Sequence, residues 1–295
     1  MKNFLKGTLK ILALLLVLLA CGYAFMVFQN NRDVSPPDRG QLNGALESAI
    51  GWLQANRDAL LLDDNQILWS FIADAAKLSY DPRLSDLVAQ YSAQASIRNS
   101  PWHALLHPEN RMATTLEEVL ALDYADYHKH FMYALSCNEE LAEHEIIQKQ
   151  MRDSFCYTSP FISSCTTHQL MALDMMVERN CGDPAQNQAL IANLQDYIEL
   201  QLTLDPRVCD VYIQRLMMLA KTGGVDRIKP AWVQRMLDAQ LADGAWEQFH
   251  PLIKLGGGYR FGFAVRWPEF RRERPSLHTT SQAILLLTIL RYTDA

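Results

Sequence analysis

The sequence lacks an excess of basic residues, has no CxxC pair and shows little of the alternating polar and apolar pattern of β-strands. Its 295 residues include 27 Lys or Arg and 33 Asp or Glu, so the formal net charge is −6. This balance argues against a nucleic-acid partner, because phosphate backbones are usually bound by a basic face. The missing CxxC pairs argue against a zinc ribbon or a thioredoxin-like site. The content, 49% apolar and 20% charged, is typical of a globular protein.

One long apolar run is present, at residues 11–28. Its 18 residues nearly span a bilayer core, which needs about 20 helical residues. Lys2, Lys6 and Lys10 precede it, so the positive-inside rule places the N-terminus in the cytoplasm. We therefore expect a cytoplasmic segment 1–10, a transmembrane signal anchor 11–28 that contacts the lipid bilayer, a linker 29–43 and an exported domain 44–295. The expected location is a bacterial-type inner membrane, with the C-terminal domain in the periplasm.

Two other interpretations of this run remain open. Residues 18–21 (LLAC) resemble a lipobox, in which Cys21 would be acylated, although the following residues stay apolar to position 28. A cleaved signal peptide fits less well, because its small-x-small cleavage pattern is poor here. All three interpretations export the domain, where disulfides can form. Its five cysteines allow two bridges and one free thiol, and both Cys156–Cys165 and Cys165–Cys181 are sterically plausible.

The domain carries an internal repeat of helical hairpins. Residues 165–173 (CTTHQLMAL) align with residues 278–286 (HTTSQAILL), and segments near Gln66 and Gln214 align more loosely. Turn signals follow three copies, at 81–83, 182–184 and 223–226. Because proline cannot continue a helix and glycine permits a left-handed cap, each turn separates an apolar inner helix from a more polar outer helix. We predict an all-α domain of antiparallel helical-hairpin repeats.

Residues 240–246 (QLADGAW) resemble the QxxDGxW pattern of the terpenoid cyclase and protein prenyltransferase toroid superfamily. The His278-Thr279-Thr280 start of an apolar segment is also similar to the inner helices of that superfamily. The resemblance implies an α/α toroid in which the Gln and Trp of the pattern join one outer helix to the next inner helix. It implies no activity, because the acidic DxDD run of the cyclases and the ordered zinc ligands of the prenyltransferases are missing. We predict no cofactor and no metal.

The segment 243–278 is rich in arginine and aromatic residues and is long for a loop, which often indicates function. Its alternating residues 259–263 (YRFGF) suit a short strand. Carboxylates and a histidine can serve acid–base chemistry, and arginine binds carboxylates and phosphates through two hydrogen bonds. The candidate catalytic residues are Asp243, Glu247 and His278, and the candidate ligand-binding residues are Trp246, Tyr259, Arg260, Arg266 and Trp267.

These observations predict a membrane-anchored exported domain that binds an anionic envelope glycan or a partner protein. The alternative is an exported toroid hydrolase or lyase acting on an acidic glycan. The enzyme hypothesis requires Asp243, Glu247, Arg260, Arg266 and His278 to meet in one cavity.

Overall fold

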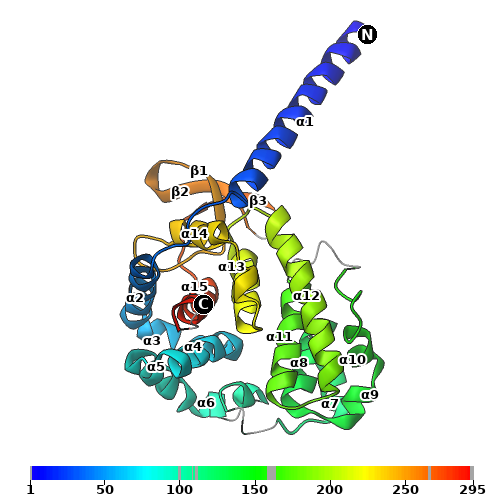
Figure 1. Cartoon of the computed structure of the whole chain (residues 1–295), viewed down its shortest axis with the longest axis vertical. Helices are drawn as coiled ribbons and strands as arrows, with labels where there is room; N and C mark the ends of the chain where they lie inside the picture. Colours follow the sequence, from blue (N-terminus) through cyan, green and yellow to red (C-terminus); the bar gives the residue numbers. More distant parts are fainter. Residues whose placement is uncertain are drawn as a thin grey trace.

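A computed structural model describes residues 2–98, 101–107, 109, 112–157, 164–264 and 267–292. The first element is the long helix α1 (Lys2–Asn30), which projects from the rest of the molecule (Figure 1). Its segment Thr8–Asn30 has a mean hydropathy of 2.7 and is long and apolar enough to cross a membrane. This inference rests on length and composition alone, and a signal sequence would meet the same test.

The end of α1 is fixed to the domain by side-chain hydrogen bonds. Tyr23 donates its hydroxyl to the Leu204 carbonyl at 2.7 Å, and the Asn30 amide donates to the Leu202 carbonyl at 2.7 Å. The hydroxyl of Tyr212 donates to the Asn30 side-chain oxygen at 2.9 Å, and Asn30 is fully buried. A short extended segment then leads to α2 (Arg39–Ala55), which Asp38 caps by accepting from the Gln41 backbone amide.

Three predicted hairpins are confirmed as pairs of helices. They are α4 (Gln66–Ser79) with α5 (Pro82–Ser92), α11 (Cys165–Glu178) with α12 (Pro184–Leu204), and α13 (Asp210–Lys221) with α14 (Pro230–Asp238). A proline occupies the first turn of α5, α12 and α14, where its missing N–H costs no helical hydrogen bond. The last helix is α15 (Leu277–Tyr292).

Shorter elements fill the middle of the chain. They are α3 (Arg57–Leu60), α6 (Ala95–Arg98), the 3-10 helix η1 (Pro101–Leu105), α7 (Leu116–Ala121), α8 (Asp126–Ser136), α9 (Glu139–Glu143), α10 (Glu145–Gln150) and the 3-10 helix η2 (Val225–Arg227).

The most buried helices pack side by side in the order α8, α11, α13, α15 and α4, and η1 contacts both α8 and α4. The outer helix α2 packs on α15, so the first helix of the domain meets the last (Figure 1). The contact surfaces of the helices are apolar and aromatic, as between α4 and α5, where the stacked rings of Trp69 and Tyr91 have centroids 4.2 Å apart. Burial of such surface is the main force that holds the helices together.

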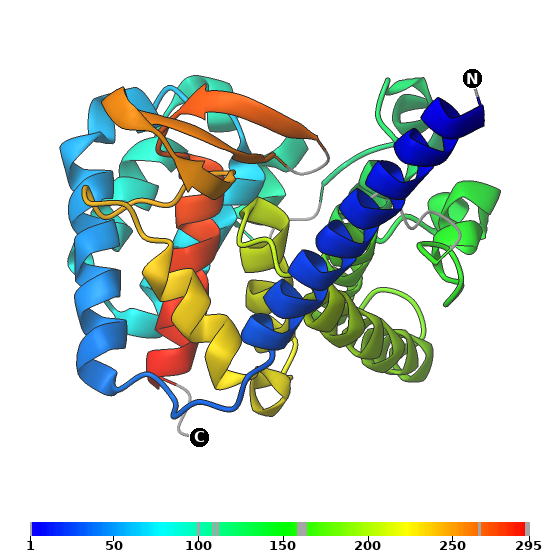
Figure 2. The ribbon, with the colours of Figure 1, turned by 90° about the horizontal axis from the view of Figure 1, so that it is seen from above.

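The expectation of an all-α domain is wrong in one respect, because residues 250–272 form a three-stranded antiparallel sheet. Its strands are β1 (His250–Lys254), β2 (Tyr259–Phe263) and β3 (Pro268–Arg272), in the order β1-β2-β3. The short strand expected at 259–263 is confirmed as β2. Figure 2 shows the sheet lying across the end of the domain at which α15 begins.

Two disulfides stabilise the half of the domain that contains α8 and α11. Cys137 at the end of α8 pairs with Cys181 beyond the end of α11, and Cys156 pairs with Cys165 at the start of α11. The second is one of the two pairings left open by the sequence, whereas Cys165–Cys181 is not formed. Cys21 and Cys209 are free. The bridges fit a domain that folds outside the reducing cytoplasm.

Candidate ligand-binding site

The five buried helices begin at the same end of the domain. Early residues of α11 contact early residues of its neighbours: His168 lies beside His128 of α8, and Thr167 donates a 2.7 Å hydrogen bond to the Gln214 side chain of α13. Asp210, the first residue of α13, lies 3.9 Å from His278, the second residue of α15. The first turns of these helices therefore gather polar side chains on one surface of the domain.

An imidazole and aromatic cluster forms the centre of this surface. The ring of His168 lies 5.4 Å from His128, 5.2 Å from Tyr127 and 5.8 Å from Phe131. One nitrogen of His168 is 2.6 Å from the Ser164 carbonyl, which fixes the ring at the start of α11. This cluster is not among the candidate sites predicted from the sequence. The sequence signal that could have indicated it is the position of His128 and His168 near the starts of their helices.

Burial keeps these histidines neutral. It lowers the pKa of His168 to about 4 and also lowers the pKa of His128. Removal from water penalises the charged imidazolium, and the neighbouring imidazoles add a smaller repulsion at His168. At neutral pH the rings therefore offer one donor and one acceptor each rather than positive charge.

A cavity of about 560 Å³ opens beside the imidazole and aromatic cluster. Its wall combines the start of α4 with α6, η1 and α8. Aromatic rings come from Trp102 and Tyr124, and Phe131, which packs against Trp102, is fully buried. Polar groups come from Asp64, Asn65, Gln66 and His128. The buried Gln66 side-chain oxygen has no hydrogen-bond partner among the described residues. We name this cavity, together with the imidazole and aromatic cluster, the histidine cleft.

A carboxyl and imidazole pair lies next to the histidine cleft. His278 is close enough to affect the pKa of His168, and its Nε2 is 3.9 Å from Oδ2 of Asp210. Burial raises the pKa of Asp210, although His278 and Arg215 oppose that shift. The other oxygen of Asp210 is buried and lacks a hydrogen-bond partner within the described part of the chain. This arrangement provides a carboxyl group that retains its proton above its ordinary pKa.

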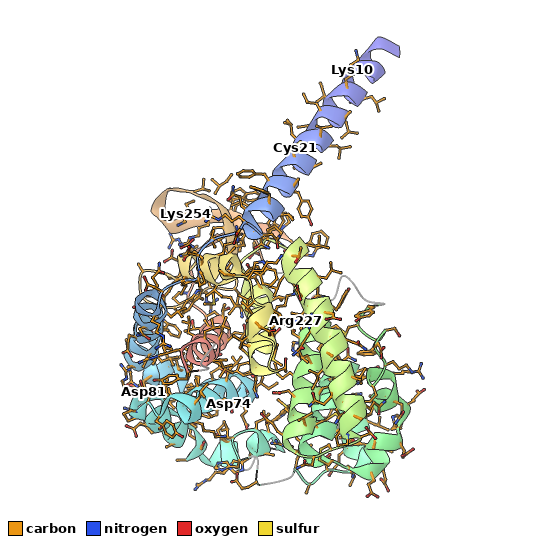
Figure 3. The ribbon with its side chains drawn as sticks, in the orientation of Figure 1. Lys10, Cys21, Asp74, Asp81, Arg227 and Lys254 are labelled. Carbon is orange, nitrogen blue, oxygen red and sulfur yellow. A yellow bond between two sulfur atoms is a disulfide. The ribbon has the colours of Figure 1, made fainter. Side chains whose placement is uncertain are left out.

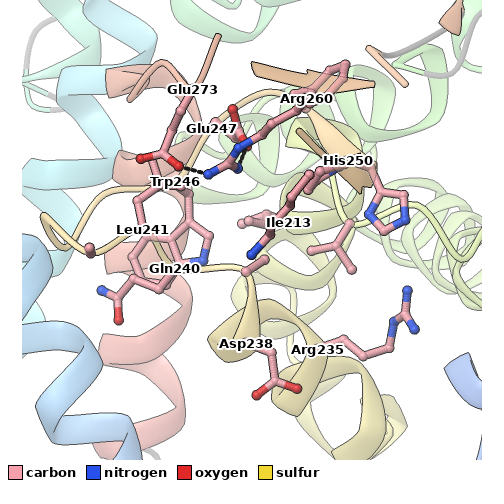
Figure 4. A pocket seen from close by; sticks show the side chains of 16 residues that line it. Ile213, Arg235, Asp238, Gln240, Leu241, Trp246, Glu247, His250, Arg260 and Glu273 are labelled. Atoms are coloured by element: carbon pink, nitrogen blue, oxygen red, sulfur yellow. Dashed lines mark hydrogen bonds and ion pairs between the residues drawn. The ribbon is translucent and has the colours of Figure 1, made fainter. Parts of the chain in front are cut away.

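The other predicted catalytic residues lie elsewhere. Glu247 is buried in a second pocket of about 420 Å³ under the sheet, where Arg260 bridges Glu247 and Glu273 (Figure 4). Burial raises the pKa of Glu247, and Arg260 opposes that shift. His250 in the same pocket has its pKa lowered by burial to about 4. Asp243 is exposed, and its carboxylate accepts the Ala245 amide at 3.1 Å in a turn.

The predicted meeting of five residues in one cavity therefore does not occur among those described. Glu247 and Arg260 share the pocket under the sheet, His278 faces Asp210, and Asp243 caps its own turn. Arg266 lies outside the described residues. The separation has a physical reason: Trp246 and Ser276 tie the segment to α15 at its two ends, and the intervening residues fold into their own sheet.

The predicted ligand-binding residues divide into buried and exposed groups. Trp246 is 1% exposed, and its indole N–H donates to the Met236 carbonyl at 2.8 Å. Its backbone N–H is also occupied, because it donates to the Thr280 hydroxyl of α15 at 3.0 Å. Tyr259 and Trp267 are exposed, by 45% and 77%. Trp246 therefore joins α14 to α15, whereas Tyr259 and Trp267 face solvent.

The described residues contain no group of three or more His, Cys, Asp or Glu side chains that could hold a metal ion. The chain matches no protein-family model, no curated protein and no solved structure. The resemblance to the toroid superfamily therefore stays a prediction.

Proposed function

We propose that this protein is an α/α toroid, anchored outside a membrane by α1, that binds an envelope glycan in the histidine cleft. The anchor proposal is supported by the length and apolarity of α1, and the export proposal by the two disulfides. The toroid proposal is supported by the packing order of the buried helices, in which η1 connects α8 to α4 and α2 packs on α15.

The observation that carries the binding proposal is the lining of the histidine cleft, which combines aromatic faces with neutral polar groups. Sugar rings present C–H groups that pack on aromatic faces, and their hydroxyls pair with amide, imidazole and carboxylate groups. The cavity of about 560 Å³ is of the size that binds small ligands.

The charges favour a neutral glycan over the acidic one suggested by the arginine-rich segment. Arg260 is compensated by Glu247 and Glu273, so it has no spare charge for an anion. The histidines of the cleft have lowered pKa values, and Asp64 adds a carboxylate to its wall. An acidic chain would meet this surface without a cation to pair with.

The test compares two tyrosines of equal exposure. Tyr124 lines the cavity and Tyr292 lies at the opposite end of α15, and each is 41% exposed. Binding of neutral β-linked N-acetylglucosamine oligomers and of polygalacturonate to the full chain in nanodiscs is measured by titration calorimetry. We expect Tyr124→Ala to weaken binding of the neutral oligomer about ten-fold, because a lost aromatic contact costs about 1 kcal/mol or more.

Tyr292→Ala should leave the affinity unchanged. Equal effects of the two substitutions, or binding of polygalacturonate alone, would contradict the assignment of the cleft to a neutral glycan.

A second candidate function, glycan hydrolysis, is favoured by the pair of Asp210 and His278. A buried carboxyl with a raised pKa can donate a proton to a leaving oxygen, as the general acid of a glycosidase does. Prolonged incubation with the neutral oligomer should then release shorter sugars from the wild-type protein, and Asp210→Asn should abolish this release while retaining binding. Binding without release would leave the protein as a binding module.

A further inference from the structure

The three-stranded sheet carries its apolar side chains on the outside. In its register Ile253 lies opposite Phe261, and Phe261 lies opposite Phe270, so these three residues form one cross-strand row. Ile253 is 53% exposed and Phe270 is 71% exposed. A sheet that covers a domain in water normally turns its apolar face to the core and its polar face to solvent.

The opposite, inward face is polar. Arg260 points into the domain toward Glu247 and Glu273 (Figure 4). Arg271 lies on the same face and stacks over the buried ring of Phe249, with its guanidinium carbon 5.2 Å from the ring centroid. The polarity of the sheet is therefore inverted, and the buried ion pair of Arg260 with Glu247 fixes its polar face toward the domain.

Further exposed apolar and aromatic side chains accompany that row in and beside the strands. Leu252, Leu255, Tyr259 and Trp267 are all more than two-fifths exposed, and Arg272 lies over the Tyr259 ring at 4.8 Å. We name the set Leu252, Ile253, Leu255, Tyr259, Trp267 and Phe270 the outer sheet face. A continuous exposed apolar surface of this kind usually marks a place of interaction.

The position of the sheet indicates its partner. The end of β2 contacts Arg207, whose guanidinium carbon is 5.7 Å from the ring centroid of Phe263. Leu204, three residues before Arg207, accepts the hydrogen bond from Tyr23 of α1. The sheet therefore lies near the end of α12 that α1 contacts, and Figure 1 shows the sheet at the end of the domain from which α1 projects. Figure 3 shows Cys21 on the projecting part of α1 and Lys254 at the sheet.

The charge of this segment also differs from that of the whole chain. Residues 250–274 contain six Lys or Arg and only two Glu, whereas the complete sequence has a net charge of −6. Aromatic residues flanked by arginine and lysine are typical of the boundary between lipid tails and water, and basic groups are attracted to anionic headgroups.

We propose that the outer sheet face lies against the headgroup region of the bilayer that α1 crosses. This inference rests on the proposed anchoring role of α1. Because the hydrogen bonds of Tyr23 and Asn30 fix α1 to the domain, contact at the sheet gives the domain a second attachment and a fixed tilt on the membrane.

The test uses tryptophan quenching in the full chain, reconstituted in nanodiscs that contain anionic lipid brominated near the headgroup. Trp267 is strongly exposed, whereas Trp52, Trp69, Trp232 and Trp246 are buried. A matched control, Trp267→Phe with Tyr80→Trp, moves the exposed tryptophan to the C-terminal end of α4, where Tyr80 is 87% exposed. A second variant, Trp267→Phe with Phe270→Trp, moves it to the middle of the outer sheet face.

We expect strong quenching in the wild-type protein and in the Phe270→Trp variant, and loss of most quenching in the Tyr80→Trp variant. Equal quenching in the wild-type protein and the Tyr80→Trp variant would overturn the proposal, as would quenching of Trp267 alone. In either case, retention of the chain in nanodiscs would still support the proposed role of α1 as a membrane anchor. Failure of the chain to remain in nanodiscs would instead overturn the anchor itself.

Discussion

At the scale of single residues, His130 of α8 limits the stability of the domain in acid. It is fully buried, and both of its ring nitrogens lack hydrogen-bond partners among the described residues. Burial lowers its pKa to about 4, below the ordinary value of 6.5. The unfolded chain therefore binds a proton at a pH where the folded chain does not, and stability falls as the pH drops from 6.5 toward 4.

We predict that His130→Phe stabilises the protein at pH 7 and flattens this loss. The substitution removes from the core an imidazole that has no hydrogen-bond partner among the described residues. It also removes the pKa shift of this imidazole, which lowers the free energy of unfolding by about 3 kcal/mol between pH 6.5 and pH 4. Urea unfolding of the two proteins between pH 4 and 7 measures the difference. An unchanged slope of stability against pH would show that other groups cause the acid sensitivity.

The residue scale also shows why the site was only partly predictable. His278 is predicted from its place at the start of an apolar helix, but no sequence pattern identifies its partner Asp210. The contact depends on how α13 and α15 align, and no local pattern specifies that alignment. For Trp246, by contrast, a local pattern was sufficient. The resemblance of residues 240–246 to the QxxDGxW pattern implies that this Trp joins two helices, and its hydrogen bonds to Met236 of α14 and Thr280 of α15 do so.

At the scale of elements, a partly buried ion network joins the C-terminal halves of three helices. Lys221 of α13 lies 2.7 Å from Asp174 and 2.9 Å from Glu178 of α11, and 3.3 Å from Asp74 of α4. Burial raises the pKa of Asp174 to about 6 although Lys221 opposes the shift. Burial disfavours the charged form of Lys221, yet the three carboxylates hold its pKa above the ordinary value.

We predict that Lys221→Met destabilises the protein by about 1–3 kcal/mol at pH 7, because it leaves the largely buried Asp174 and the more exposed Asp74 and Glu178 without their shared cation. The cost should shrink toward pH 5, where the folded variant binds more protons than the unfolded chain and stability therefore falls as pH rises. Lys77→Met is the control: its side chain is 58% exposed and 4.0 Å from Asp74, so it should cost less than about 1 kcal/mol. A pH-independent cost of Lys221→Met would contradict this account.

Elements were predictable where local signals act. Pro82, Pro184 and Pro230 start the second helices of the three hairpins, and a proline or glycine acts through its own backbone. The strands β1 and β3 were not predicted, because each is short and contains both a proline and charged side chains. They are strands because β2 lies between them and pairs with both through backbone hydrogen bonds. This pairing depends on the folding of the whole segment and not on the local sequence of either strand.

At the scale of the whole molecule, residues 240–246 connect the last helices of the domain to the first. The Gln240 side chain donates to the Ala45 carbonyl of α2 at 2.9 Å and to the Gly244 carbonyl at 2.8 Å. Gly244 has φ of +96°, and a Cβ atom there would lie 2.3 Å from the Ser48 carbonyl oxygen of α2. Glycine is therefore needed twice at this position, for its backbone conformation and for the close approach of α2.

We predict that Gly244→Ala lowers the free energy of unfolding by about 3 kcal/mol or more, because it combines left-handed strain with forced separation of α2. Gly223→Ala is the matched control: its φ is +88°, but nothing lies within 4 Å of the added Cβ, so it should cost only about 1–2 kcal/mol of backbone strain. The two variants are compared by urea unfolding of the full chain in nanodiscs. Since the backbone strain is shared, the difference between them measures the close contact of α2 with the turn at residues 240–246. Equal costs would mean that α2 moves aside freely, and the proposed closed ring would then lose its support at this junction.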